Sequence, residues 1–339
     1  MIIRYARLGL FILFLVLAKS TIFAQIVDCS LTKCAPIVLK IVKDDGKTAI
    51  VKPIVTTPLP NPILNIQEGQ YPFGTEITFT IPTGLNTQAN ASGSMVIQYK
   101  WDYETDWTTS TKTILKNSGV LYVRAQAADI SSEIKKYNFN LFYTRVTLVG
   151  NSMTQHFEFP QIGWNGRWGM AASAVDKDYK AILERYLNAI RPNTAFNIVP
   201  TGLIEKDFNN FDFDLFNNNY GGLYKDSDLI VIRLGENNLD GQLPSSQYKA
   251  IMERYIKLIR NNPKARVVIT STFWKGFPNT NKVLKEIADE NGYDWVSLEV
   301  IGKDDSNYAY GLFTDPGVAY HPGDKGMKAI ADLIYAKIK

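Results

Sequence analysis

Residues 147–156 read TLVGNSMTQH and place a serine, Ser152, two positions after Gly150 at the end of an apolar run. A serine hydroxyl becomes a nucleophile when a base takes its proton and N–H donors face the oxyanion of the tetrahedral intermediate. Gly150 permits a sharp turn out of a strand, which leaves the following N–H groups free to face a ligand. Gly-Asn-Ser also ends strands in ordinary turns, so the role of Ser152 depends on the rest of the chain.

Two downstream segments supply further groups for this chemistry, in a chain that has only two histidines, His156 and His321. Residues 234–238 read LGENN and place Asn237 after another apolar run, where its side-chain amide can donate to an oxyanion. Residues 320–332 read YHPGDKGMKAIAD and place His321 just before a helical stretch. The three segments together indicate a serine esterase.

In this order the segments resemble the blocks of the SGNH (GDSL-like) hydrolase family: Gly-Asp-Ser, a glycine in the second block, Gly-x-Asn-Asp, and Asp-x-x-His before the last helix. The resemblance covers the second half of the chain, about 195 residues, and leaves the first half outside it. It implies that Ser152 is the nucleophile and His321 the general base. The N–H of Ser152, Gly202 and Asn237 would form the oxyanion hole, although the segment around Gly202, VPTGLIEKDF, matches the second block poorly.

Three departures from the family pattern affect the predicted mechanism. Asn151 stands in place of the aspartate, Gly-x-Asn-Asp becomes Gly-Glu-Asn-Asn, and Val318 occupies the position three residues before His321. Asp315 lies six residues before His321, and a short loop could bring it back to orient the imidazole. Otherwise the site is a Ser-His dyad whose histidine is held by a backbone carbonyl or by another acid such as Glu236.

Aromatic residues gather in the loops predicted to surround the site. Flat aromatic faces with polar edges suit sugar rings, whereas a lipase would line its groove with aliphatic side chains. The alternative is that the tryptophans of GWNGRWGMAAS pack against the next helix. His156 is the second candidate for the base, but its surroundings do not match the family, which leaves a substrate contact or a structural role. The predicted substrate-binding residues are His156, Trp164, Trp168, Glu236, Trp274 and Tyr320.

The pattern after residue 143 predicts a parallel sheet with crossover helices. The apolar runs RVTLVG, FNIVP, DLIVIRL, RVVITST and DWVSL alternate with stretches of helical periodicity. We therefore expect a three-layer α/β/α domain of flavodoxin-like type over residues 144–339. Each segment with candidate chemistry follows one of these runs or precedes the last helix. This is the carboxyl edge of the sheet, where ligands bind in such folds.

Residues 25–143 follow a different pattern, with short runs of alternating apolar and polar residues such as TEITFTI and GVLYVRAQA, separated by turn residues. This spacing is typical of an immunoglobulin-like β-sandwich. The predicted accessory domain carries no catalytic constellation. It would bind glycan, form part of the rim of the pocket, or space the enzyme from a surface.

Residues 1–24 have a basic start, a short apolar run and a small residue at the end, which predicts a secretory signal peptide and leaves an uncleaved membrane anchor as the alternative. Its removal lowers the formal charge from +4 to about +1, which argues against a nucleic-acid surface. No later run is long enough to cross a membrane. Cys29 and Cys34 are predicted to form a small-loop disulfide in an exported protein. No metal or organic cofactor is implied.

The resulting prediction is a secreted or periplasmic carboxylic-ester hydrolase that removes O-acyl groups, foremost O-acetyl groups, from carbohydrate through an acyl-enzyme. An ordinary imidazole would make its rate rise with pH through ~6.5. Two alternatives remain: a lipid or phospholipid acyl hydrolase with the same Ser-His pair, and a non-catalytic carbohydrate-binding or surface protein on the same scaffold.

Overall fold

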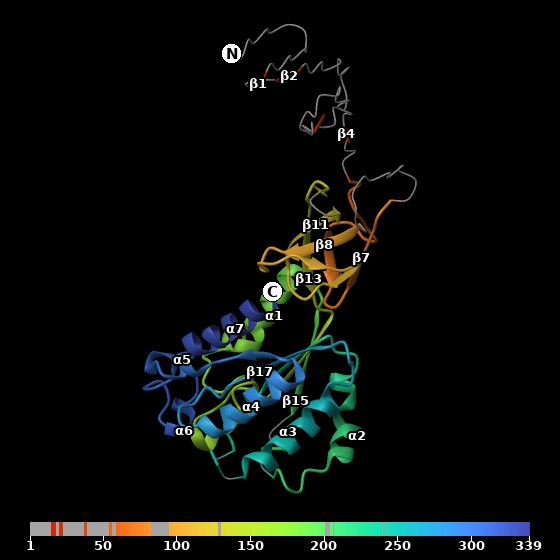
Figure 1. Ribbon diagram of the computed structural model, residues 1–339. Helices are drawn as coiled ribbons and strands as arrows, with labels where there is room; N and C mark the ends of the chain where they lie inside the picture. Colours follow the sequence, from red (N-terminus) through yellow and green to blue (C-terminus); the bar gives the residue numbers. More distant parts are fainter. Residues whose placement is uncertain are drawn as a thin grey trace.

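The computed structural model describes residues 59–82, 95–127, 130–200, 204–205, 207–238, 240–241 and 243–339 (Figure 1). Before residue 59 it describes four short strands: β1 (Leu15–Leu17), β2 (Ser20–Ile22), β3 (Ile37–Val38) and β4 (Ile54–Val55). Apart from β1 and β2, the predicted signal peptide lies outside the described residues, as do Cys29, Cys34 and Gly202. Among the described helices, none has the length and apolar character needed to span a bilayer.

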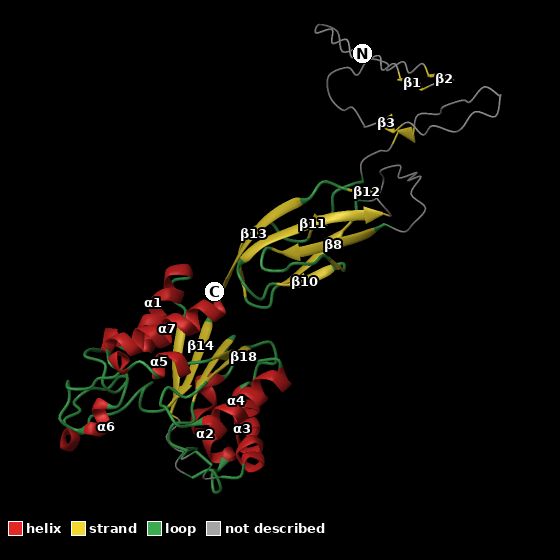
Figure 2. Cartoon of the chain, turned by 60° about the vertical axis from the view of Figure 1, so that its left-hand side comes forward, coloured by secondary structure: helices red, strands yellow, loops and turns green. Residues whose placement is uncertain are grey.

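The second half of the chain forms a five-stranded parallel sheet, which confirms the predicted α/β/α fold. Its strand order is β15-β14-β16-β17-β18, the flavodoxin-like arrangement. Every residue of β16 and β17, two of the three inner strands, is buried, because helices cover both faces of the sheet (Figure 2). The strands are β14 (Arg145–Gly150), β15 (Ala195–Pro200), β16 (Leu229–Arg233), β17 (Arg266–Thr270) and β18 (Asp294–Val296).

Alternate residues of each strand face opposite helical layers. Val146 and Leu148 of β14 pack in the cluster that holds the apolar stripes of α1 and α7, whereas Val149 packs in the cluster of α2, α3 and α4. The longer helices are α1 (Tyr179–Ile190), α2 (Phe213–Tyr224), α3 (Ser245–Ile259), α4 (Pro278–Asn291) and α7 (Asp324–Ile338), and the short ones near the site are α5 (Glu299–Gly302) and α6 (Pro316–Ala319).

The described residues between 59 and 143 form two sheets that share one apolar core, in agreement with the predicted β domain. In β11 buried and half-buried residues alternate, as expected of a strand with one face in the core. Ile77 and Phe79 of the smaller sheet pack in the same cluster as Leu121 and Phe139 of the larger one. The sheets are β10-β7-β5 and β6-β13-β11-β8-β9, with β12 paired to β11.

The strands of this β-rich part are β5 (Ile63–Leu64), β6 (Gly69–Pro72), β7 (Glu76–Thr80), β8 (Val96–Trp101), β9 (Thr108–Thr109), β10 (Lys112–Ile114), β11 (Gly119–Ala127), β12 (Ile130–Ser131) and β13 (Lys135–Phe142). The chain passes into the parallel sheet between β13 and β14. The domain limits at residues 24 and 143 stay a prediction.

Arg266, the first residue of β17, joins the two parts of the molecule. Its guanidinium donates to the Lys116 carbonyl oxygen at 2.8 Å and to Asn117 Oδ1 at 3.1 Å, and it pairs with Asp294 Oδ2 at 2.6 Å. These contacts lie at the amino ends of the parallel strands, so the described β-rich residues lie at the end of the sheet opposite α6 (Figure 1). They therefore form no part of the rim at the carboxyl edge.

Candidate active site

The structure brings together two residues that are 169 positions apart in the sequence. Ser152 follows β14 and His321 follows α6, and Ser152 Oγ lies 2.8 Å from His321 Nε2. The turn after β14 requires a glycine, because a Cβ on Gly150 would collide with the side chain of Thr154. This turn brings the half-buried serine hydroxyl to the carboxyl edge of the sheet. The distance is that of a nucleophile and its base.

A backbone carbonyl orients the imidazole of His321. Its Nδ1 lies 2.7 Å from the carbonyl oxygen of Gly317 in α6. Since a carbonyl can only accept, Nδ1 carries the proton, and the lone pair of Nε2 is left to accept from the serine hydroxyl. The ring of Trp274 packs edge to face with the imidazole, with centroids 5.2 Å apart. The tautomer required of a general base is thus fixed without a carboxylate.

Burial makes the imidazole reluctant to become charged. His321 is only 6% exposed, and this burial lowers the pKa of His321 to about 4, with the positive charge of Arg233 as a further cause. The hydrogen bond to Gly317 and the charge of Glu236 oppose the shift. His321 is therefore neutral, and competent as a base, at a lower pH than the ~6.5 expected from an ordinary imidazole.

Asp315 does not occupy the place expected of a triad acid. Its carboxylate is the N-cap of α6 and accepts from the backbone N–H of Val318 at 3.0 Å. The chain turns into α6 immediately after Asp315, which directs the carboxylate along the helix start and the Gly317 carbonyl toward His321. Asp315 therefore does not contact His321 as the predicted triad acid would. The histidine is held by a backbone carbonyl, which was one of the two alternatives to the triad.

Two of the three predicted oxyanion donors can be located. The amide N–H of Ser152 donates to no group in the described part of the chain and is free to face a substrate oxygen. Asn237 lies exposed after β16, and its Nδ2 donates one hydrogen to Glu205 Oε2 at 2.9 Å, which leaves the other available. Gly202, the third predicted donor, belongs to a segment outside the described residues.

A buried ionic cluster adjoins the turn that carries Ser152. The guanidinium of Arg233, fully buried, donates to Glu236 Oε1 at 2.6 Å and also to Asn151 Oδ1. Asn151 Nδ2 donates to Glu236 Oε2 at 2.8 Å, and the N–H of Phe273 donates to Glu236 Oε1 at 3.0 Å. The cluster joins the loops that follow β14, β16 and β17, and so fixes the turn that carries Ser152.

This cluster changes the role predicted for Glu236. The side chain of Glu236 is 1% exposed and its oxygens are occupied by the three donors, so it has no contact to offer a substrate. It holds the serine turn instead. Arg233 was missed at the sequence level, although a single arginine ending the run LIVIR is a visible signal, because a buried charge needs a partner nearby.

The aromatic residues divide into core and rim. Trp164 is 2% exposed and packs against Met170 and Val318, so the alternative of ordinary packing holds for it and it is not available to stack on a substrate. Trp168 is half-buried and donates to the Ala172 carbonyl. Trp274 and Tyr320 are half-buried, and their rings are 5.4 Å apart beside His321.

His156 lies close to the site without being bonded to the serine. Its backbone N–H donates to the Trp168 carbonyl, and its Nδ1 donates to the Phe157 carbonyl at 2.6 Å. The charge of His156 is the smallest of the causes that act on the pKa of His321, which it lowers. The imidazole in contact with Ser152 is thus that of His321, and a substrate contact through the half-buried His156 stays a prediction.

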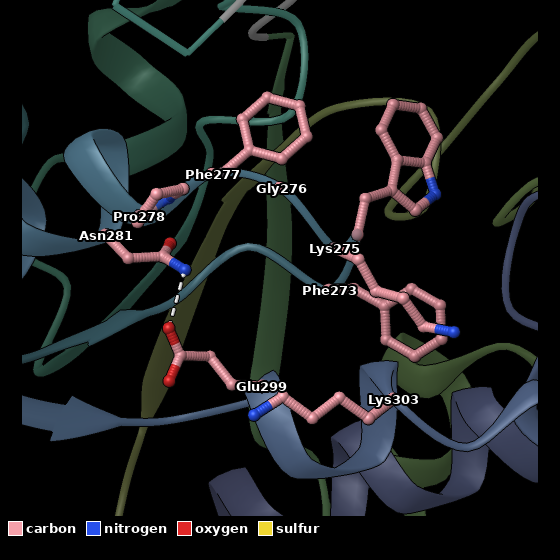
Figure 3. A pocket seen from close by; sticks show the side chains of 9 residues that line it. Phe273, Lys275, Gly276, Phe277, Pro278, Asn281, Glu299 and Lys303 are labelled. Carbon is pink, nitrogen blue, oxygen red and sulfur yellow. Dashed lines mark hydrogen bonds between the residues drawn. The ribbon is translucent and has the colours of Figure 1, made fainter.

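A cavity of about 170 Å³ lies beside the segment that carries Trp274 (Figure 3). Its lining combines aromatic and polar side chains, and Asn281 Nδ2 donates to Glu299 Oε1 at 3.0 Å across it. Neither Ser152 nor His321 lines this cavity, so it flanks the Ser-His pair. Within the described ranges, no group of three or more His, Cys, Asp or Glu side chains is arranged to hold a metal ion.

Comparison with known families agrees with this geometry. Residues 148–329 match the model of the GDSL-like Lipase/Acylhydrolase family. This match spans more than half of the chain, so the protein belongs to that family, and the resemblance found in the sequence is confirmed. No protein with a curated description matches the chain.

Several solved structures are similar to the chain at low identity. A family two carbohydrate esterase from Clostridium thermocellum, in complex with cellohexaose, is 14% identical over 79% of this chain and 92% of that one, with a TM-score of 0.40. A family two carbohydrate esterase from Cellvibrio japonicus is 13% identical over 83% and 93%, with a TM-score of 0.36. A two-domain esterase active on acetylated mannans is 17% identical over 57% of this chain and 48% of its own, with a TM-score of 0.37.

Proposed function

We propose that this GDSL-family protein is a serine esterase that removes acyl groups, foremost acetyl, from carbohydrate. The observation that carries the proposal is the 2.8 Å contact between Ser152 Oγ and His321 Nε2, with Nδ1 of the same ring facing the Gly317 carbonyl. A hydroxyl in contact with an unprotonated imidazole nitrogen is the arrangement that activates a nucleophile at neutral pH.

The reaction proceeds in two steps through an acyl-enzyme. Ser152 Oγ attacks the acetyl carbonyl carbon while His321 Nε2 takes the hydroxyl proton, and the Ser152 N–H and Asn237 amide stabilise the oxyanion. The intermediate collapses by breaking the bond to the sugar oxygen, which receives the proton from His321. Water, deprotonated by His321, then attacks the acyl-serine, and acetate leaves as Ser152 regains its proton.

The residues beside the Ser-His pair support a carbohydrate substrate. The rings of Trp274 and Tyr320 are partly exposed beside His321, and the Trp274 indole N–H donates to the Tyr320 carbonyl at 2.8 Å. Rings held in this way stack on a pyranose without losing side-chain freedom on binding. The flanking cavity, with polar Asn281 and Glu299 and the ring of Phe277, offers the same mixture to an adjoining sugar unit (Figure 3).

Acetate release from acetylated polysaccharides and monosaccharide acetates tests the proposal. Wild-type protein should release acetate, and Ser152→Ala should fold normally and lose turnover by a factor of 10³ or more, roughly the value for removal of a nucleophile. Ser246→Ala, an exposed serine in α3, is the matched control and should retain full activity. Turnover retained by Ser152→Ala, or failure of a fluorophosphonate to label Ser152, would overturn the proposal.

One observation favours hydrolysis of lipid acyl chains as a second candidate. Phe157 is 68% exposed and Leu312 is 70% exposed, and both lie in loops that flank the site. Exposed large apolar side chains near a catalytic site are suited to an acyl chain or a lipid surface. A series of p-nitrophenyl esters separates the candidates: kcat/KM that falls from acetyl to octanoyl supports the carbohydrate ester, and kcat/KM that rises supports the lipid.

We further propose that the protein is exported to the periplasm or the medium. The support is the order of residues 1–24, in which Arg4 and Arg7 precede an apolar run that ends in Ala24. Detection of a mature N-terminus at Gln25 in the exported fraction tests this proposal. Recovery of only the full-length chain with the cells would contradict it.

A further inference from the structure

Glu205 is a buried acid that has no part in the reaction described above. It is 5% exposed and lies in the segment after β15, whereas its partners lie in the loop after β16. Glu205 Oε1 accepts from the backbone N–H of Gly235 at 2.6 Å, and Oε2 accepts from Asn237 Nδ2 at 2.9 Å. One carboxylate thus holds both the start of this loop and the side chain of the oxyanion donor.

Glu236, between these two points, is held by Arg233, Asn151 and Phe273. The N–H of Gly235 and the amide of Asn237 depend instead on Glu205. Gly235 has a φ of +125°, a conformation that side chains rarely adopt, and a Cβ there would lie 2.8 Å from Thr280 Cγ2. Asn237 is exposed, so its amide would rotate freely without a partner. The bond to Glu205 uses one hydrogen of Nδ2 and thereby sets the direction of the other. Since both partners are donors, they require two acceptor oxygens, which the ionised carboxylate supplies.

We propose that Glu205, in its ionised form, is the positioning residue that aims the Asn237 amide at the oxyanion. This inference rests on the proposed function, because it assigns a partner to a donor of that same site. A protonated Glu205 has only one oxygen that is purely an acceptor, and the O–H competes with one of the two N–H groups. Protonation therefore frees the Asn237 amide to turn away from the oxyanion and slows the chemical step, while substrate binding is little affected.

The surroundings of Glu205 place this change near neutral pH. Burial and the negative charge of Glu236 raise the pKa of Glu205 to about 7, against the two hydrogen bonds and the charge of Arg233. From α3 it is faced by the hydroxyl groups of Tyr248 and Tyr255, whose pKa values burial raises well above 10, so both stay neutral. The carboxyl group of Glu205 therefore changes charge near neutral pH.

The same carboxyl must affect activity and stability with opposite sign. Activity rises with pH as Glu205 ionises through about 7. Stability changes the other way: the folded pKa lies above the unfolded value, so the folded state binds more protons in this window, and its contribution to stability is lost as pH rises. A residue with a purely structural role would not raise activity while it lowered stability.

The decisive experiment compares Glu205→Gln with the wild type, with released acetate as the readout, between pH 5.5 and 8. The glutamine amide has one acceptor oxygen, as the protonated acid does. We therefore expect kcat of the variant to be lower by roughly tenfold or more at pH 8, with KM within about threefold, and the difference to shrink toward pH 5.5. The melting temperature should show the reverse, with the wild type losing stability relative to the variant as pH rises.

Asp207→Asn is the matched control. Asp207 also accepts from one backbone N–H and one asparagine amide, both of Asn210, at 3.1 and 2.9 Å, but it is exposed. Its replacement should leave kcat and the pH profile unchanged. If Glu205→Gln has the kcat and the pH profile of the wild type, the inference is overturned.

Two further measurements keep the inference testable and separate from the proposed function. If Glu205→Gln does not fold, the wild-type kcat alone decides: a partial fall centred near pH 7 supports the inference, and a flat profile from pH 5.5 to 8 overturns it. If acetate release does not depend on Ser152, the proposed function fails. If it depends on Ser152 but not on the state of Glu205, only this inference fails.

Discussion

The base and the oxyanion donor of the same site are held by different kinds of partner. The imidazole of His321 is oriented by a neutral group, the carbonyl of Gly317, and is packed against the ring of Trp274. The Asn237 amide is oriented by the carboxyl group of Glu205, next to the ion pair of Arg233 and Glu236. The base half of the site, His321 with Gly317 and Trp274, is therefore built from dipoles and apolar contact. The donor half, Asn237 with Glu205 and the ion pair, is built from buried charge.

This contrast determines which half responds to pH. A carbonyl does not titrate, and burial disfavours the imidazolium, so the base half is unchanged across the neutral range. Burial and neighbouring charge raise the pKa of Glu205 to about 7, so the charge of the donor half changes within that range. Substitutions in each half test the contrast.

Removal of the donor should change activity most. Asn237→Ala is expected to lower kcat by about 10²–10³, with KM changed by less than about threefold, because an oxyanion donor acts mainly on the transition state. Steady-state kinetics of acetate release at pH 8 provide the measurement. Asn210→Ala, which removes an exposed amide bonded to Asp207, is the control and should not change kcat. A fall of less than threefold for Asn237→Ala would exclude this residue from the oxyanion hole.

The pH at which activity is lost on the acidic side should lie far below the value expected for an ordinary histidine. In Glu205→Gln, which removes the titration of the donor half, kcat/KM should be level from pH 8 to 5.5 and then decrease about tenfold per pH unit below about 4, where His321 takes up a proton. Activity regained on return to pH 7 shows that the loss is titration and not unfolding. A loss of kcat/KM centred near pH ~6.5 would mean that the imidazole is not desolvated.

The sequence predicted the base half less well than the nucleophile for a physical reason. Ser152 and Asn237 follow strands of a parallel sheet, and strand ends meet at one edge by topology alone. Asp315 and Gly317, in contrast, differ by two positions, and which of them faces His321 depends on where α6 begins. A backbone carbonyl leaves no residue type in the sequence by which to recognise it.

Burial was the other quantity that the sequence pattern did not supply. Trp164 and Trp274 are both tryptophans in loops at the same edge, yet only Trp274 keeps an exposed face beside His321. Glu236 was expected near the substrate, and its position was foreseen while its complete enclosure by Arg233 and Asn151 was not. The parallel sheet and its helices were predictable because their periodic apolar residues record burial directly.

The charge balance of the donor half predicts a loss of stability for Asn151→Asp. Asn151 accepts from Arg233 and donates to Glu236, and an aspartate would instead oppose the Glu236 carboxylate across a buried contact. We expect a loss of about 1–3 kcal/mol in the free energy of unfolding at pH 8, and a smaller loss at pH 5, where a proton replaces the missing donor. Urea denaturation measures both, with exposed Asn210→Asp as the control. Equal stability of variant and wild type would show that the cluster tolerates a second negative charge.

Asp315→Asn should change activity least, and it decides how the base half works. The amide oxygen of an asparagine can still accept from the Val318 N–H, so α6 keeps its cap and Gly317 keeps its place against His321. We therefore expect kcat at pH 7 to remain within about threefold of the wild type. In a triad, the same change of acid to amide selects the wrong tautomer and lowers kcat by about 10⁴.

Asp315→Ala extends the same test, because it removes the cap and not only the charge. It should cost about 1 kcal/mol of stability and a modest part of kcat, since the Gly317 carbonyl then loses part of its support. If kcat is higher for Asp315→Asn than for Asp315→Ala, the residue acts as a helix cap, because a cap needs only an acceptor oxygen. If Asn and Ala are equally inactive, by a hundredfold or more, the negative charge of Asp315 acts on His321 and the base half is no longer the neutral one.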